Sequence, residues 1–158
     1  MDWQTVCRRS QELQDRRPVM RNLELSHYNL AFKCWLETMD LEHRQIFPLT
    51  YSMCCKNHFY FLSNEIMVAK LVSQEVEGPI GIVIYKETEP KHIHIYSVEI
   101  REDFRYKGDG RKMINYFRET NDYVELSSLP ESKVFYEKCG LKQQEEGRFI
   151  WKRGEGWL

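Results

Sequence analysis

Long apolar runs are missing from this 158-residue sequence. No stretch approaches the roughly 18 apolar residues of a membrane-spanning helix, so we expect no membrane span. Residues 1–4 contain no apolar core of a secretory signal, and we expect no leader. The formal net charge is only −1, which argues against a protein built for general nucleic-acid binding. Five arginines between residues 8 and 21 could still form a basic patch, although a solvated helix face is the simpler interpretation.

A cysteine framework is also missing. The five cysteines are an odd number without regular spacing, which favours reduced thiols and a cytoplasmic location. Cys54, Cys55 and His58 could form half of a metal site, but no second matching pair exists. We therefore expect no metal and interpret these cysteines as small apolar side chains.

Internal repeats and linkers rich in proline, glycine or serine are absent, so the length fits a single domain, residues 1–158. Residues 2–17 are polar and compatible with a helix that Pro18 ends, and apolar residues recur at helical spacing from Asn22 to Asp40. We therefore expect a helical region over residues 1–57 and a sheet-forming region over residues 58–158.

Strand patterns begin after His58. Residues 59–62 and 66–72 flank Ser-Asn-Glu, as in a hairpin, and residues 80–85 are apolar on both faces, as in a central strand. The next strand, His92 to Ile100, contains a phase slip. Ile93 and Ile95 place apolar residues at odd positions, whereas Val98 and Ile100 place them at even ones. A β-bulge near Tyr96-Ser97 would produce this slip.

The remaining pattern alternates helices and strands. It predicts a helix over residues 111–120, a strand over 123–126, and two final strands within 142–153 that turn at Glu146-Gly147. Between the strand at residues 123–126 and the two final strands, the sequence predicts another helix. Ser128 would be its N-cap, with Pro130 in the first turn and Glu131 completing a capping box. Gly140 is placed to end that helix.

Two short segments stand out. Arg105–Gly110 (Arg-Tyr-Lys-Gly-Asp-Gly) joins the 92–100 strand to the following helix. Glycines at such a turn allow close approach of a ligand, and the free N–H groups of the first helical turn can hold a phosphate. Phe135–Leu141 (Phe-Tyr-Glu-Lys-Cys-Gly-Leu) follows about thirty residues later. Together the two segments resemble the signature segments of the GNAT superfamily of acetyl-CoA-dependent N-acetyltransferases.

This resemblance covers roughly residues 66–153. It implies an α/β fold with a mixed, mostly antiparallel central sheet flanked by helices, and acetyl-CoA as the cosubstrate. In the family a bulged strand diverges from its parallel neighbour and opens a slot for the pantetheine arm of the cofactor. GNAT domains usually begin with a strand and then two helices that shape the acceptor site. We recognise no first strand here and expect the chain to begin directly with helices.

The resemblance also assigns cofactor-binding residues. Backbone N–H groups of residues 107–111 would anchor the pyrophosphate, nearby cations would assist, and the strand backbone at Ile100 would bind the pantetheine amides. The candidates are Ile100, Arg105, Lys107, Gly108, Asp109, Gly110 and Arg111. Asp109 departs from the family's small or apolar residue, and a carboxylate there costs energy unless it points away. Leu129 replaces the family's Asn, which removes one hydrogen bond to the cofactor.

Catalysis needs an acid and a base. Tyr136 is the candidate acid, because a phenol of pKa about 10 is protonated at neutral pH and can donate to a thiolate whose thiol has a pKa of about 8.5. A packing role is the alternative for Tyr136. His94 is the first candidate base and Glu99 the second, although a lone strand histidine is often structural. A backbone N–H near Glu99 or Ile100 would stabilise the oxyanion.

The acceptor remains open. A small amine, a protein lysine or N-terminus, and an aminoacyl-tRNA are all compatible with direct transfer of acetyl to a primary amine. The sequence is also compatible with a homodimer. The alternative is a catalytically silent GNAT-fold module that binds CoA or a protein partner. A nucleic-acid-binding protein that uses the N-terminal arginines ranks last, given the charge.

Overall fold

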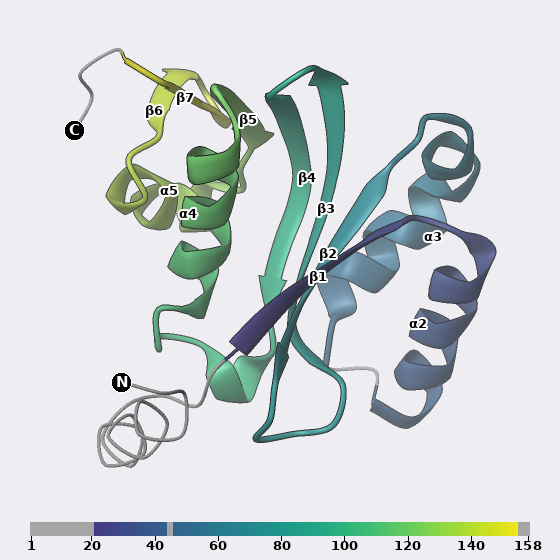
Figure 1. Ribbon diagram of the computed structural model, residues 1–158. Coiled ribbons are helices and arrows are strands. Elements are labelled where there is room, and N and C mark those ends of the chain that lie inside the picture. Colours follow the sequence, from purple (N-terminus) through teal and green to yellow (C-terminus); the bar gives the residue numbers. More distant parts are fainter. Residues whose placement is uncertain (1–20, 44–45, 155–158) are drawn as a thin grey trace, which may run out of the picture.

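The computed structural model describes residues 21–43 and 46–154, and it contains a seven-stranded mixed sheet with strand order β1-β2-β3-β4-β5-β7-β6 (Figure 1). Only β4 and β5 are parallel neighbours; the other pairs are antiparallel. The strands are β1 (Arg21–His27), β2 (Met67–Ser73), β3 (Pro79–Glu89), β4 (His92–Ile100), β5 (Tyr123–Ser127), β6 (Lys142–Glu145) and β7 (Arg148–Lys152). The α-helices are α2 (Leu30–His43), α3 (Pro48–Ser63), α4 (Asp109–Thr120) and α5 (Lys133–Lys138). Two 3-10 turns, η1 (Glu102–Phe104) and η2 (Pro130–Ser132), precede α4 and α5.

Helices cover both faces of the sheet, with α2 and α3 on one side and α4 and α5 on the other (Figure 1). The α2/α3 face buries a cluster that includes Phe32, Phe61 and Ile84. The opposite face buries a larger cluster that includes Ile95 and Phe117. β3 belongs to both clusters because its first seven residues are buried, as expected for a central strand. The predicted α/β class with a mostly antiparallel sheet is confirmed.

The N-terminal expectation is wrong in one respect, because the first described element is a strand. β1 pairs with β2 over its full length, from Arg21–Ser73 to His27–Met67. The apolar residues from Asn22 to Asp40 recur at helical spacing, but residues 21–27 pair with β2 and form a strand instead of the start of a helix. The helix starts later, where the Asn29 side chain accepts a hydrogen bond from the backbone N–H of Phe32 at 2.8 Å and caps it. The helix expected over residues 2–17 lies outside the described residues.

Residues 59–62 are helical, and the predicted hairpin is wrong. They form the last turns of α3, beyond a break in helical geometry at Asn57 (φ −121°, ψ 17°), so the expected 57/58 boundary falls inside this helix. Phe61 is buried while Phe59 is 81% exposed. The aromatic run resembles a strand in composition, but only one of its side chains points into the core.

The phase slip in β4 is a β-bulge, as predicted. Ile84 of β3 pairs with Ser97, and the next residue, Tyr85, pairs with Ile95, so that Tyr96 is the extra residue. Ile93 and Ile95 before the bulge, and Val98 and Ile100 after it, all pack on the α4/α5 face. The bulge keeps the apolar residues of both halves on one face.

The segment before α5 differs from the predicted capping box. Ser128 donates its hydroxyl to the backbone oxygen of Leu129 and does not cap a helix, and the first turn, η2, is a 3-10 turn. Gly140 has φ +88° directly after the C-cap Cys139, as predicted for a helix end. No helix in the described part of the chain is long and apolar enough to cross a membrane.

Candidate active site

The parallel strands β4 and β5 separate at the bulge. They pair only from His92–Tyr123 to Ile95–Leu126, and β4 then continues to Ile100 without β5 beside it. Backbone groups on that edge of β4 are therefore left for another partner. The hydroxyl of Ser97, at the bulge, is buried and has no hydrogen-bond partner in the described part of the chain.

Helix α4 begins beside the end of β4 without a side-chain cap. Its N-cap, Gly108, has a left-handed conformation (φ +87°) that favours glycine, and it is exposed. The N–H of Lys112 donates to the backbone oxygen of Gly108, at 3.0 Å. The N–H groups of the first turn are the donors that can hold an anion.

Gly110 packs closely against the second motif segment. A Cβ atom at this position would lie 3.1 Å from the Phe135 ring and 3.5 Å from the Ile100 side chain. The two motif segments therefore touch each other, since Gly110 belongs to the first and Phe135 to the second. Asp109 is also buried, at the first position of α4, where the helix dipole favours a carboxylate.

Three cations lie in the loop before α4 and in its first turn. Arg105 is exposed, and its Nε donates to the backbone oxygen of Ile100 at 3.0 Å, so one acceptor of the free strand edge is already used. Lys107 places its Nζ 5.1 Å from the centroid of the Phe104 ring. Arg111 is exposed on the first turn of the helix.

Tyr136 points from α5 into the core on the same face as α4. Its ring packs against Phe135 and Phe149, with centroids 5.0 and 5.9 Å away. Burial raises the pKa of its phenol to about 12, so the group is protonated at neutral pH. Leu129, before η2, is exposed.

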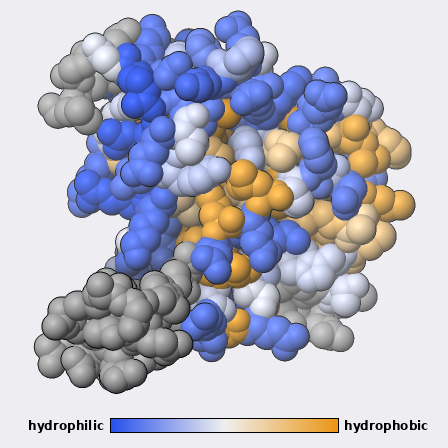
Figure 2. All heavy atoms as spheres, in the orientation of Figure 1, coloured by the Kyte–Doolittle hydropathy of each residue, from blue (hydrophilic) through white to orange (hydrophobic). Residues whose placement is uncertain are grey.

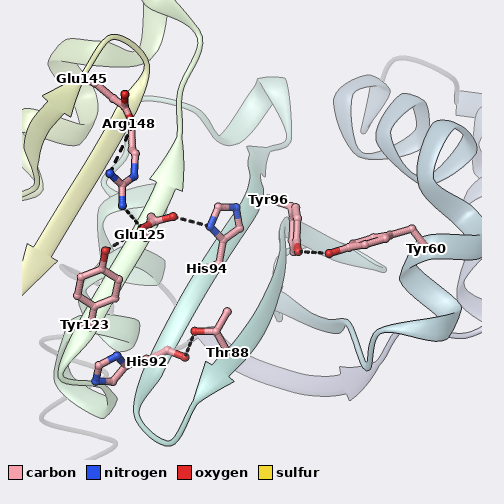
Figure 3. A network of polar contacts seen from close by, with 9 residues as sticks. All are labelled: Tyr60, Thr88, His92, His94, Tyr96, Tyr123, Glu125, Glu145 and Arg148. Atoms are coloured by element: carbon pink, nitrogen blue, oxygen red, sulfur yellow. Dashed lines mark hydrogen bonds and ion pairs between the residues drawn. The ribbon is translucent and has the colours of Figure 1, made fainter.

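A pocket of about 260 Å³ opens on the opposite face of the sheet, next to the bulge. Three tyrosines from different elements line it, namely Tyr60 of α3, Tyr96 of β4 and Tyr123 of β5. His94 and Glu125 line it as well, from adjacent strands. Figure 3 shows these two side chains pointing toward each other and the hydroxyls of Tyr60 and Tyr96 in contact, at 3.3 Å.

His94 and Glu125 form a hydrogen-bonded pair. The Nδ1 of His94 lies 3.2 Å from Glu125 Oε1, while the other carboxylate oxygen accepts bonds from the Tyr123 hydroxyl at 2.7 Å and from Arg148 at 2.8 Å. Burial alone would raise the pKa of the Glu125 carboxyl, but these hydrogen bonds and the charge of Arg148 outweigh it and hold the pKa below its ordinary value. In the neutral imidazole tautomer that carries its proton on Nδ1, this nitrogen donates to the ionised Glu125 and Nε2 keeps its lone pair.

Glu99 is held elsewhere. It is buried on the α3 side of the sheet, and its Oε1 accepts hydrogen bonds from the N–H and the hydroxyl of Thr50, at 2.7 and 2.8 Å. Its Oε2 accepts the N–H of Leu49 at 3.1 Å. These N–H groups belong to the first turn of α3, so Glu99 caps that helix from a distant strand.

Sequence reasoning named His94 but missed Glu125 and Arg148. A signal was present, because Glu125 alternates with the buried Val124 and Leu126 in a short strand and therefore faces the side opposite to the core. The sequence could not show that this side faces His94. That contact follows from the parallel register of β4 and β5.

In Figure 2 the left side, which carries α4, is mostly hydrophilic, whereas apolar residues gather in the middle of the view and on the side that carries α2 and α3. Apolar side chains exposed on α2 and α3 include Leu30, Leu49, Phe59 and Leu62.

The adjacent cysteines of α3 differ in exposure, since Cys54 is buried and Cys55 is exposed.

No protein-family model matches the sequence, and no curated protein matches it significantly. Solved structures do match the fold. A putative GNAT-family acetyltransferase from Desulfovibrio desulfuricans is 10% identical, with a TM-score of 0.56 over 84% of this chain and 99% of that one. The Bacillus subtilis N-acetyltransferase YlbP, solved with coenzyme A, is 13% identical, with a TM-score of 0.56 over 84% and 97%. A second Bacillus subtilis acetyltransferase, in complex with CoA, is 15% identical, with a TM-score of 0.54 over 84% and 99%. The chain therefore has the GNAT fold.

Proposed function

We propose that this protein is an acetyl-CoA-dependent N-acetyltransferase that transfers acetyl directly to a primary amine. The observation that carries the proposal is the separation of β4 from β5 at the bulge, beside the uncapped start of α4. Structures with this fold contain CoA in two Bacillus subtilis proteins, which supports acetyl-CoA as the cosubstrate here.

The residues present fit such a ligand. N–H groups of residues 109–111 would bind the pyrophosphate, assisted by the exposed Arg105 and Arg111. The free edge of β4 after Ile95 would pair with the pantetheine amides, as a strand pairs with a neighbour. Backbone N–H groups near Glu99 and Ile100, together with the buried Ser97 hydroxyl, are candidate donors to the oxyanion.

His94 would act as the general base from the other face of the sheet. Glu125 fixes its Nδ1, so that Nε2 can take a proton from the attacking amine. Tyr136 would then donate its phenolic proton to the departing thiolate. Glu99 cannot serve as a base without giving up three hydrogen bonds to α3, so we assign it a structural role.

A catalytically silent module with this fold is the second candidate, because Asp109 places a buried carboxylate at the start of α4. Replacing Tyr136 by Phe separates the two candidates. An enzyme should lose about 100-fold or more in kcat while its affinity for CoA, measured by calorimetry, stays within a factor of about three. Wild-type protein that binds acetyl-CoA but acetylates no amine would support the silent module.

A further inference from the structure

Lys86 lies next to the candidate base His94, on the strand opposite to the one that carries Glu125. Lys86 of β3 pairs with His94 of β4, and His94 pairs with Glu125 of β5. Directly paired residues point to the same face of a sheet. A cation, an imidazole and a carboxylate therefore form one row across three adjacent strands, and all three residues line the 260 Å³ pocket.

The two charged ends of this row are not equivalent. The oxygens of Glu125 are already engaged by His94, Tyr123 and Arg148. Arg148 in turn also pairs with Glu145, at 3.5 Å. Lys86, by contrast, forms no ion pair with any residue in the described ranges 21–43 and 46–154. Its acidic neighbours do not supply one, since Glu87 points to the opposite face and Glu89 lies 3.6 Å from His92.

Lys86 is therefore available to bind an anion beside the base, whereas Glu125 is already held by three neighbouring side chains. This arrangement favours an acceptor that carries an anionic group over one whose only charge is its ammonium group. The tyrosine rings of Tyr60, Tyr96 and Tyr123 add flat, largely apolar walls that suit a hydrophobic side chain.

We propose that the acceptor is a primary amine that carries an anionic group a few bonds from its nitrogen, in chemical terms an amino acid, and that Lys86 binds the anion. This inference rests on the proposed acetyl transfer and narrows its acceptor. Lysine side chains of proteins and the esterified amino acids of aminoacyl-tRNA have no carboxylate at that distance, so they fit the pocket less well.

Matched acceptors test the proposal. L-phenylalanine, L-phenylalaninamide and 2-phenylethylamine share the ring and the amine, but only the first carries a carboxylate; 2-aminoethylphosphonate supplies an anion of the phosphate type. We expect kcat/KM for acetyl transfer to favour phenylalanine over its amide by at least about 10-fold, as for one charge-assisted contact. Preference for the phosphonate instead would support the anion site and identify a phosphate-like ligand.

Variants locate the effect. Lys86→Met keeps the aliphatic stem and should bring the phenylalanine-to-amide ratio close to one, whereas Lys86→Arg should preserve it. Lys91→Met, on the exposed turn between β3 and β4, is the matched control and should leave the ratio as in the wild type. Equal or better turnover of phenylalaninamide and 2-phenylethylamine by the wild type would overturn the proposal but leave the acetyltransferase function intact. Binding of acetyl-CoA without turnover of any acceptor would overturn both.

Discussion

The buried carboxylate of Glu99 permits a decisive test of its role. Glu99→Gln preserves the size of the side chain but replaces one oxygen by an NH₂ group. The amide oxygen can still accept the two bonds from Thr50, while the NH₂ group would face the N–H of Leu49. Two donors would then meet in a buried place, and α3 would lose the negative charge at its N-terminus.

The magnitude follows from these contacts. Hydrogen bonds to charged groups contribute about 1.5–3 kcal/mol each, and leaving a buried donor unpaired adds a similar cost, so we expect a loss of about 2–4 kcal/mol. The N-cap, Phe47, makes no side-chain cap hydrogen bond and has no acceptor that could replace the Glu99 carboxylate. For a domain of this size the loss corresponds to a Tm lower by roughly 5–15 °C.

Thermal and urea unfolding would measure this loss, and kcat would be measured at a temperature where the variant is folded. Thr50→Val serves as the graded control, since it removes only the hydroxyl bond to Oε1 and should cost about 0.5–1.5 kcal/mol. A Glu99→Gln protein with unchanged Tm and a kcat reduced 100-fold would refute the structural role and restore Glu99 as a base.

Two further predictions concern the site. Gly110→Ala should destabilise the fold by about 1–3 kcal/mol and weaken CoA binding, because its Cβ would lie 3.1 Å from the Phe135 ring. Phe135→Leu removes the contacting ring, so Gly110→Ala should cost clearly less in that background, and an equal cost would contradict the packing argument. Glu125→Gln should cost roughly 1 kcal/mol at pH 7 and flatten the acid side of the stability profile. The folded-state pKa of Glu125 is lowered, so its contribution is present above the unfolded carboxyl value of about 4.3 and is lost as the pH falls through the lower folded value. Urea midpoints measured between pH 2.5 and 7 would check this, and an unchanged acid slope would count against the ion pair.

Local pattern was sufficient for much of the sheet. The phase of the apolar residues in β4 predicted the bulge, because side chains alternate strictly along a strand and an extra residue must shift them. The glycines predicted the start of α4 and the end of α5, where the backbone has φ values of +87° and +88°. These features depend on a few neighbouring residues, so the sequence by itself determined them.

Pairing and packing across the chain decided the rest. β1 is a strand because seven residues of β2 pair with it, and α3 keeps its aromatic last turns because Phe61 reaches the core. The role of Glu99 depended on a helix start some fifty residues earlier, and the partner of His94 on the register of two parallel strands. Alternation along a strand determines which face of the sheet a side chain occupies. The residues that it contacts on that face are determined only when distant segments pack together. The row from Lys86 through His94 to Glu125 therefore exists only in the folded sheet.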